Sequence, residues 1–370
     1  MSRQRVKIGI VGCGNISRAY LMTAQTFPIL EVAAVADLDV ARAQARASEF
    51  WVPKACTVKE LLAEPHIEIV VNLTIPKAHY EVAIQAVEAG KHVYNEKPLT
   101  ISLEDGKKLV AAAQKKKVRT GCAPGTFLGG GLQTCRKLID DGAIGAPLSA
   151  TAFMITPGHE RWHPDPEFYY KEGGGPMFDM GPYYLTALLN LLGPAKRVCG
   201  STPYLKPERT ITSEPKKGTK IKVETPDHVT GIVDFTSGAC ATIVTSFAVW
   251  HGNLPRIEIY GSDGSLSCPD PNSLGGPIKL RKADDKEWQE VQLTHGHSGG
   301  SRWGLGVADM AYALRSGRAH RASGENALHA LEIMHGFMNS SREGRHVELT
   351  TPYNRPTPLP AGLSDIALDE

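Results

Sequence analysis

Three side chains of this 370-residue chain have types and spacings that suit proton transfer. Lys97 lies in the run Glu96-Lys97-Pro98, directly after a strand-like segment, and the carboxyl ends of parallel strands form the crevice in which such sheets bind ligands. Asp179 and Tyr183 are four residues apart in a helical segment, so they project from the same face. The alternative interpretations are a solvated surface lysine and a carboxylate that stabilises a helix N-terminus.

A second feature is the run of small residues from Gly12 to Ser17, which follows one strand-like segment and opens a helical one. In a Gly-x-Gly-x-x-Gly loop, the glycines form a tight turn and let the backbone approach a pyrophosphate at a helix N-terminus. Gly12, Gly14, Asn15 and Ile16 are therefore predicted to bind a dinucleotide. Ser17 replaces the third glycine, which weakens the pattern, and an ordinary strand-to-helix turn is the alternative.

Asp37 ends the next apolar segment, about 20 residues beyond this loop, where an acid can accept hydrogen bonds from both ribose hydroxyls. A carboxylate there repels a 2′-phosphate, and Leu38 supplies no positive charge to offset the repulsion. NAD is therefore the predicted cofactor and is favoured over NADP. The alternative role for Asp37 is a helix N-cap before Val40.

These residues need a scaffold that brings the ends of several strands together. The first 123 residues alternate short apolar runs with helical ones: strands are expected at 6–11, 30–37, 67–73, 92–94 and 119–122, and helices at 18–27, 40–50 and 79–89. This alternation predicts an α/β fold that begins with a doubly wound parallel sheet of the Rossmann type. We expect residues 1–123 to form a dinucleotide-binding domain.

Residues 124–349 have a different pattern, which predicts a substrate-binding and oligomerisation domain of α+β type with a large, mostly antiparallel open sheet. Strands are expected at 148–155, 228–236, 239–249 and 255–260, with hairpin turns at 236–238 and 262–264. Helices are expected at 132–141, 177–192, 309–316 and 326–341, the last two covering one face of the sheet. The proline-rich residues 350–370 are expected to form an extended tail.

Composition argues against several classes of function. The chain has 41 basic and 39 acidic residues, a formal charge of +2, so no nucleic-acid partner is expected. No apolar run approaches the roughly 18 to 20 residues of a membrane span, and the N-terminus lacks a secretory apolar region, so we expect a soluble cytoplasmic protein without a membrane partner. Seven scattered cysteines without a Cys-x-x-Cys pair, and irregularly spaced histidines, predict no metal site.

Taken together, these motifs resemble the Gfo/Idh/MocA family, named after glucose-fructose oxidoreductase, inositol dehydrogenase and MocA. The resemblance spans nearly the whole chain and includes the segment from Gly173 to Tyr183. It implies an NAD(P)-dependent oxidoreductase that removes hydride from a CH–OH group of a sugar, cyclitol or glycoside. It also adds cofactor-binding residues, namely Asn72, Thr74, Pro76, His79, Glu96 and Lys97.

In that family, the lysine of the Glu-Lys-Pro motif and an aspartate followed four residues later by histidine or tyrosine line the reacting carbon. The implied roles here are Tyr183 as base, Lys97 as its electrostatic partner and Asp179 as the residue that orients the substrate. A free tyrosine, with a pKa near ~10, is a poor base at neutral pH, so the Lys97 ammonium would have to assist it. The roles of Lys97 and Tyr183 could also be exchanged.

The segment 158–170 is dense in aromatic and polar side chains that suit carbohydrate rings and hydroxyls. Trp162, His163 and Tyr169 are its substrate-binding candidates, with Asp179 and Tyr183. His297, in a second histidine-containing run, is a further candidate. A packed loop with only a structural role is the alternative for the first group, and a mobile glycine-rich loop for the second.

Other functions stay open at this point. A tightly held cofactor would allow one sugar to be oxidised while another is reduced, or a 3-keto glycoside to be made. A protein of another class, an NAD-binding sensor or scaffold without catalysis, is also compatible with the dinucleotide motif. We expect a homodimer or homotetramer, because relatives associate through the sheet face that no helix covers.

Overall fold

The structure is a computed structural model that describes residues 4–300 and 303–369. The described residues form two compact units. The first contains the chain up to Gln133, Leu293–Leu328 and the residues from Pro356 onward, and the second contains Thr134–Gln292 and His329–Arg355. The observed units differ from the expected ranges 1–123, 124–349 and 350–370, because the chain returns to the first unit after residue 292 and again after residue 355.

The first unit is built on a six-stranded, fully parallel sheet in the order β3-β2-β1-β4-β5-β6. Its strands are β1 (Val6–Val11), β2 (Leu30–Ala36), β3 (Ala55–Cys56), β4 (Ile69–Asn72), β5 (His92–Asn95) and β6 (Thr120–Cys122). Every residue of β4 is buried, as is all of β1 except Lys7, which fits strands covered on both faces. The expected Rossmann sheet is confirmed.

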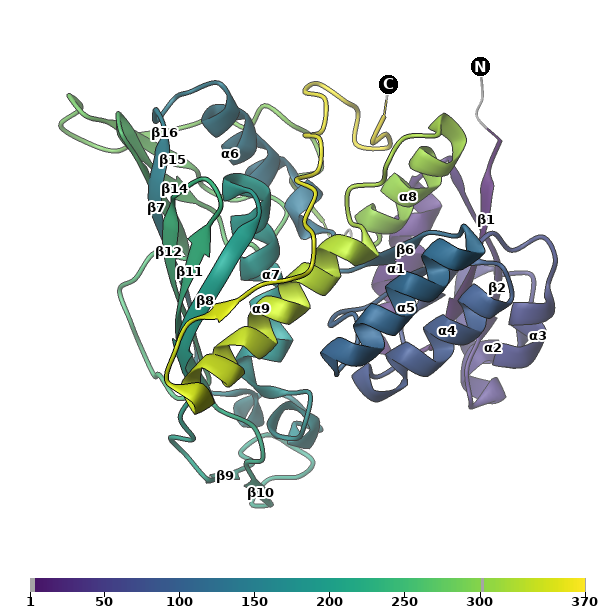
Figure 1. Ribbon diagram of the computed structural model, residues 1–370. Helices are drawn as coiled ribbons and strands as arrows, with labels where there is room; N and C mark the ends of the chain where they lie inside the picture. Colours follow the sequence, from purple (N-terminus) through teal and green to yellow (C-terminus); the bar gives the residue numbers. More distant parts are fainter. Residues whose placement is uncertain (1–3, 301–302, 370) are drawn as a thin grey trace. The chain divides into compact units, whose positions relative to one another are not determined.

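Helices connect these strands: α1 (Asn15–Thr26), α2 (Val40–Phe50), α3 (Val58–Ala63), α4 (His79–Glu88) and α5 (Leu103–Lys116). Helices α4 and α5 lie side by side (Figure 1). Helix α5 has clear signals at both ends. Ser102 accepts the N–H of Asp105 at its start, and Lys115 and Lys116 stand in its last turn.

Helix α8 (Leu305–Ser316) corrects one expectation, since it does not cover the sheet of the second unit. It belongs to the first unit and packs against β6. A side chain at Gly121 of β6 would come within 2.5 Å of the terminal methyl of Met310, so the glycine allows this close packing. The amphipathic pattern that predicted the helix carries no information about which sheet receives its apolar face.

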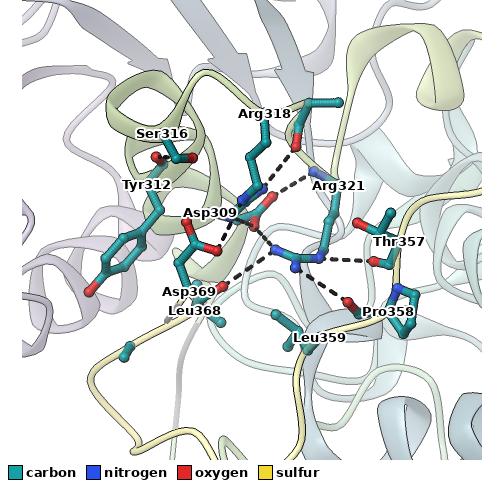
Figure 2. Close-up of polar contacts among 12 residues, drawn as sticks. Asp309, Tyr312, Ser316, Arg318, Arg321, Thr357, Pro358, Leu359, Leu368 and Asp369 are labelled. Atoms are coloured by element: carbon teal, nitrogen blue, oxygen red, sulfur yellow. Dashed lines mark hydrogen bonds and ion pairs between the residues drawn. The ribbon is translucent and has the colours of Figure 1, made fainter.

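The described part of the C-terminal tail, residues 350–369, contains turns but no helix or strand, and side chains bind it to the first unit. Figure 2 shows the buried Asp309 carboxylate paired with both Arg318 and Arg321. Arg321 also donates to three tail carbonyls, at 2.9 Å to Thr357 O, 3.3 Å to Pro358 O and 3.4 Å to Leu368 O. These contacts explain why residues distant in sequence from the Rossmann sheet complete the same unit.

The second unit contains a nine-stranded sheet in the order β16-β15-β14-β13-β7-β12-β11-β8-β17, antiparallel except between β7 and β12. The strands are β7 (Pro147–Ile155), β8 (Ala195–Ser201), β11 (His228–Phe235), β12 (Cys240–Ser246), β13 (Ile257–Gly261), β14 (Gly264–Cys268), β15 (Lys279–Lys282), β16 (Gln289–Glu290) and β17 (Val347–Glu348). A separate hairpin is formed by β9 (Glu208–Thr210) and β10 (Lys220–Lys222). Both expected hairpin turns are present, so this fold class is confirmed.

The remaining helices are α6 (Gly130–Asp140), α7 (Gly175–Leu192) and α9 (Gly324–Glu343). Helix α7 packs on β7, β11 and β12, and Phe337 of α9 packs over β8 and β11. A Cβ at Gly231 would lie 2.3 Å from the Phe337 ring, so the glycine makes room for it. Strand residues alternate between this buried face and a more open one, where Ile232 is 45% exposed.

No described helix is long and apolar enough to cross a membrane.

Candidate active site

The loop after β1 has the geometry of a pyrophosphate cradle. Gly12 has a φ of +97°, and a Cβ there would lie 2.7 Å from the carbonyl carbon of Leu73, so only glycine fits. Gly14 precedes the first turn of α1, and a Cβ on it would meet nothing within 4 Å. The backbone at Gly14 therefore borders open space beside the start of α1, where Asn15 and Ile16 lie. A helix N-terminus of this kind attracts a negatively charged group.

Ser17 serves the same purpose as the missing third glycine. It is fully buried, and its hydroxyl donates to the Gly14 carbonyl at 2.6 Å. The small side chain thus folds back on the loop instead of separating α1 from the sheet. The departure from the glycine pattern leaves the loop geometry intact.

Asp37 follows β2 and lies beside this loop. Its Oδ2 accepts the N–H of Cys13 at 2.8 Å, and its Oδ1 accepts the N–H of Asp39 at 3.0 Å. The N-cap of α2 is Asp39, which accepts N–H groups of Ala41 and Arg42, so the alternative role for Asp37 is wrong. A carboxylate held against the glycine loop is well placed to meet the ribose of a dinucleotide.

The charge around Asp37 is less negative than the sequence analysis supposed. Leu38 is 98% exposed and apolar, but helix α2 brings Arg42 to 4.0 Å from Asp37 Oδ1. Arg46 of the same helix donates to the Gly14 carbonyl at 3.3 Å. Two guanidinium groups thus adjoin the predicted ribose position. The i, i+4 spacing of Arg42 and Arg46 in the helix that follows Asp37 was the available signal. The expectation that no positive charge lies near Asp37, which rested on Leu38, does not hold.

Three of the predicted cofactor residues, Asn72, Thr74 and His79, form a hydrogen-bonded connection between the ends of β4 and β5. Asn72 is fully buried and donates to Asn95 Oδ1 and to the carbonyl of His79, both at 3.0 Å. Thr74 donates its hydroxyl to Asn72 Oδ1 at 2.7 Å, and Pro76 begins a short 3₁₀ turn that leads into α4. These contacts shape the loop that faces the carboxyl edge of the sheet.

His79 is also fully buried, with Nδ1 2.7 Å from Pro98 O and Nε2 3.0 Å from Thr74 O. Burial lowers its pKa. A neutral ring donates to one of these two carbonyls. His79 therefore joins the β4 loop to the Glu-Lys-Pro segment, and we assign it to the shape of the cofactor loop.

The Glu-Lys-Pro segment follows β5, as expected. Glu96 accepts the Tyr20 hydroxyl at 2.7 Å and the N–H of Lys97 at 2.9 Å, while its own N–H donates to Asn72 O at 2.8 Å. Lys97 is half-buried. The backbone that carries the Lys97 ammonium is thus held by both α1 and β4, at the edge of the sheet where a dinucleotide binds.

In the second unit, Asp179 and Tyr183 lie on α7 and are half-buried. The glycines before them are required by packing, since a Cβ on Gly174 would lie 2.7 Å from the Tyr169 carbonyl oxygen and Gly175 has a φ of +82°. The start of α7 therefore lies directly against the segment 158–170. This close approach brings the predicted substrate residues to Asp179.

The segment 158–170 forms two short 3₁₀ turns, at His159–Arg161 and Glu167–Tyr170. The aromatic rings of this segment cluster beside Asp179. Trp162 is 61% exposed, and the His163 ring lies 5.3 Å from those of both Trp162 and Tyr169. Burial lowers the pKa of His163, which accepts the N–H of Asp165. The structure thus brings Trp162, His163 and Tyr169 together with Asp179.

Sequence reasoning missed His159, which makes the direct contact. Its Nε2 lies 2.9 Å from Asp179 Oδ2, and its ring centroid lies 4.3 Å from that of Tyr169. Its place at the start of the aromatic-rich segment was the available signal. The segment was too long for its members to be ranked without knowing where α7 packs.

His297 differs from the other substrate candidates. It belongs to the first unit, is 2% exposed and stacks on Phe27 at 5.7 Å. Its Nε2 lies 2.8 Å from the carbonyl of Ala367, and its N–H donates to Asp365 at 2.6 Å. The expectation that His297 contacts substrate is therefore corrected, because its side chain is enclosed by the C-terminal tail and α1.

A buried ionic network stabilises the segment 158–170. The Arg209 side chain is 1% exposed and pairs with Glu160 at 3.0 Å and with Asp227 at 2.8 Å. The Tyr170 hydroxyl donates to Glu160, and burial raises the pKa of Tyr170.

Among the described residues, no group of three His, Cys, Asp or Glu side chains is arranged to hold a metal ion.

Comparison with known proteins agrees with these features. Residues 6–123 match the oxidoreductase family with an NAD-binding Rossmann fold, and residues 132–267 match the GFO/IDH/MocA C-terminal domain. A 1,5-anhydro-D-fructose reductase from Ensifer adhaerens is 29% identical, over 93% of this chain and 98% of its own. A scyllo-inositol 2-dehydrogenase (NADP(+)) from Bacillus subtilis is 23% identical, over 93% and 96%.

A solved levoglucosan dehydrogenase, in complex with NADH and L-sorbose, has the same fold, with a TM-score of 0.82 and 21% identity. The similarity covers 94% of this chain and all of the other. Both family domains are thus present in the expected order, on a fold shared over nearly the full length. The chain belongs to the Gfo/Idh/MocA family of NAD(P)-binding oxidoreductases.

Proposed function

We propose that this protein is an NAD-dependent dehydrogenase that oxidises a secondary alcohol of a sugar, cyclitol or glycoside. The observation that carries most weight is the Asp37 carboxylate held 2.8 Å from the N–H of Cys13 in the glycine loop. A carboxylate in this position beside a glycine loop supports binding of a ribose next to a pyrophosphate. The relatives that act on inositol, anhydrofructose and levoglucosan support the substrate class.

The residues present fit a dinucleotide. The backbone at Gly12 and Gly14, with the first turn of α1, would receive the pyrophosphate, and Asp37 would accept the ribose hydroxyls. When bound, NAD supplies the hydride acceptor at C4 of its nicotinamide. The positive charges of Arg42 and Arg46 would also suit the 2′-phosphate of NADP, whereas the Asp37 carboxylate favours NAD.

Tyr183, as tyrosinate, would accept the proton of the substrate hydroxyl, Lys97 would be its electrostatic partner, and Asp179 would orient the substrate. The Lys97 ammonium would stabilise tyrosinate, since tyrosine alone holds its proton at neutral pH. The exposed ring of Trp162 and the nearby His163 and Tyr169 suit the face and hydroxyls of a sugar ring. This set supports a polyhydroxylated substrate over a simple alcohol.

The test is a substrate panel with purified protein. We would first release and identify any cofactor retained through purification, then incubate the protein with NAD or NADP and with inositols, aldoses, anhydrosugars and glycosides, following reduced cofactor by absorbance. Reduction with at least one polyol supports the proposal. Failure across the panel contradicts it and favours a sensor or scaffold. Retained cofactor that cycles between two sugars favours a sugar–sugar oxidoreductase or a glycoside 3-oxidase.

We also propose that the protein forms a homodimer or homotetramer through the open face of the nine-stranded sheet. That face exposes apolar strand residues such as Ile232, 45% exposed. Light scattering coupled to gel filtration measures the oligomer directly. Ile232→Lys should shift it toward the monomer, and an unchanged oligomer would exclude this face.

A further inference from the structure

His159 has a hydrogen-bond partner at each ring nitrogen. Its Nε2 lies 2.9 Å from Asp179 Oδ2, and its Nδ1 lies 3.2 Å from the indole nitrogen of Trp162. An indole N–H can only donate, so Nδ1 must be the acceptor. A neutral imidazole that accepts at Nδ1 carries its proton on Nε2. His159 is therefore a donor to the Asp179 carboxylate.

The backbone of His159 is fixed as firmly as its ring. Its N–H donates to the Tyr170 hydroxyl oxygen at 3.0 Å, and that hydroxyl donates in turn to Glu160. Glu160 is held by Arg209, whose guanidinium also pairs with buried Asp227. This chain of contacts runs from the interior of the second unit to the backbone of His159, whose ring contacts Asp179.

The ring is also enclosed by aromatic neighbours. The centroids of Tyr169 and Phe247 lie 4.3 Å and 4.5 Å from that of His159, and its side chain is 12% exposed. A 180° rotation of the imidazole would put Cδ2 in place of Nδ1 and Cε1 in place of Nε2, so it would break both hydrogen bonds. The donor is thus aimed at Asp179 by both hydrogen bonding and shape.

We propose that His159 is a positioning residue that keeps Asp179 ionised and oriented toward substrate, and that Trp162 sets the tautomer in which it does so. A hydrogen bond donated to a carboxylate favours its charged form. Because both nitrogens are engaged, His159 does not accept the substrate proton, which Tyr183 accepts in the proposed reaction. This inference rests on the proposed function, in which Asp179 contacts substrate.

The test compares substitutions that differ only in where they place a donor. In His159→Gln the amide nitrogen can reach Asp179, whereas in His159→Asn it ends near the position of Nδ1 and falls short. We expect kcat to fall roughly 10- to 100-fold in His159→Asn and His159→Ala, because a hydrogen bond to a charged group is lost. His159→Gln should remain within about threefold of the wild type.

The KM for NAD should be unchanged in all three variants, since the cofactor loop lies in the first unit. Exposed His251 provides the matched control, and His251→Gln should leave turnover unaltered. Circular dichroism and thermal midpoints identify any variant that fails to fold. Equal losses in the Gln and Asn variants, both folded, would overturn the positioning role.

A second measurement does not depend on turnover. In holoprotein with ¹⁵N-labelled histidine, the resonance that disappears in His159→Gln identifies His159, and its nitrogen shifts should report the neutral Nε2–H tautomer. Trp162→Phe keeps an aromatic ring but removes the N–H at Nδ1, so the Nδ1 resonance of His159 should shift. An Nδ1–H tautomer in the wild type, or an unchanged spectrum in Trp162→Phe, would overturn the role of Trp162.

The two readouts separate the failure of this inference from that of the proposed function. If the wild type oxidises no compound of the panel, the proposed function fails while the tautomer measurement still decides the hydrogen-bond arrangement. If the wild type is active and His159→Asn equals it, only the role of His159 fails.

Discussion

The proposed cofactor loop of the first unit, residues 12–17 with Asp37, and the proposed substrate segment of the second, residues 158–170, are built in different ways. Around Gly12 and Asp37, backbone conformation and backbone N–H groups do most of the positioning. Around Asp179, the positioning is done by side chains from several segments, with buried Arg209 at the base. A site shaped by backbone geometry leaves a compact sequence motif, and a site shaped by side-chain packing does not.

The largest expected effect tests whether the first unit contributes more than a cofactor cradle. Lys97→Ala should lower kcat about 10³-fold, since acid–base groups contribute roughly 10² to 10⁴, while NAD binding stays near its wild-type value. Steady-state kinetics and a cofactor titration measure the two quantities. Lys107→Ala, on an exposed position of α5, is the control. Unchanged turnover in Lys97→Ala would refute the assignment.

The buried network under the substrate segment is expected to dominate the stability of that region. Arg209→Met leaves Glu160 and Asp227 without their cation, and breaking a buried pair from one side costs about 3 to 5 kcal/mol. Denaturant unfolding measures the loss. The exposed pair Lys220–Glu208 lies on the same hairpin, so Lys220→Met should change the midpoint little. Similar shifts in both variants would show that burial does not distinguish the two pairs.

The two loop glycines should separate folding from cofactor binding. Gly12→Ala puts a side chain at positive φ and against Leu73, which should destabilise the protein by about 1 to 3 kcal/mol. Gly14→Ala meets no protein atom, so its thermal midpoint should stay close to that of the wild type while NAD affinity falls. Retained affinity in a folded Gly14→Ala protein would mean that pyrophosphate does not approach this backbone.

The smallest effect concerns cofactor choice. Arg42→Ala should weaken NADP binding about two- to fivefold relative to NAD, since exposed ion pairs contribute less than about 1 kcal/mol. Fluorescence titration with both reduced cofactors gives the ratio. Lys108→Ala, another exposed helical cation, should leave it unchanged. An unaltered ratio in Arg42→Ala would restore the simpler argument from Asp37 alone.

Most strands and helices were predictable because their apolar periodicity is local. The range 40–50 was predicted with the bounds of α2, and the Rossmann order followed from alternation. Helix α5 was overlooked despite the Ser102 cap. Helix α8 was predicted as a helix but assigned to the wrong sheet, since an amphipathic pattern states that a face is buried and not against what.

The residues of the candidate site also differ in how far local sequence patterns could predict them. Gly12, Asp37 and the Glu96-Lys97 pair could be proposed from motifs, because each contacts neighbours close in sequence or backbone groups. His297 was proposed for substrate on residue type and proved to be enclosed by the C-terminal tail. Residue type alone does not distinguish an enclosed histidine from an accessible one.

By itself, the sequence determined the family, the parallel sheet and the dinucleotide loop, because these depend on periodicity and on glycine positions that only one backbone conformation satisfies. Tertiary structure alone decided that His159 contacts Asp179, that Arg42 adjoins Asp37, and that residues 293–328 and 356–369 complete the first unit. Such contacts join residues that packing brings together, and no local pattern encodes which distant side chain will arrive.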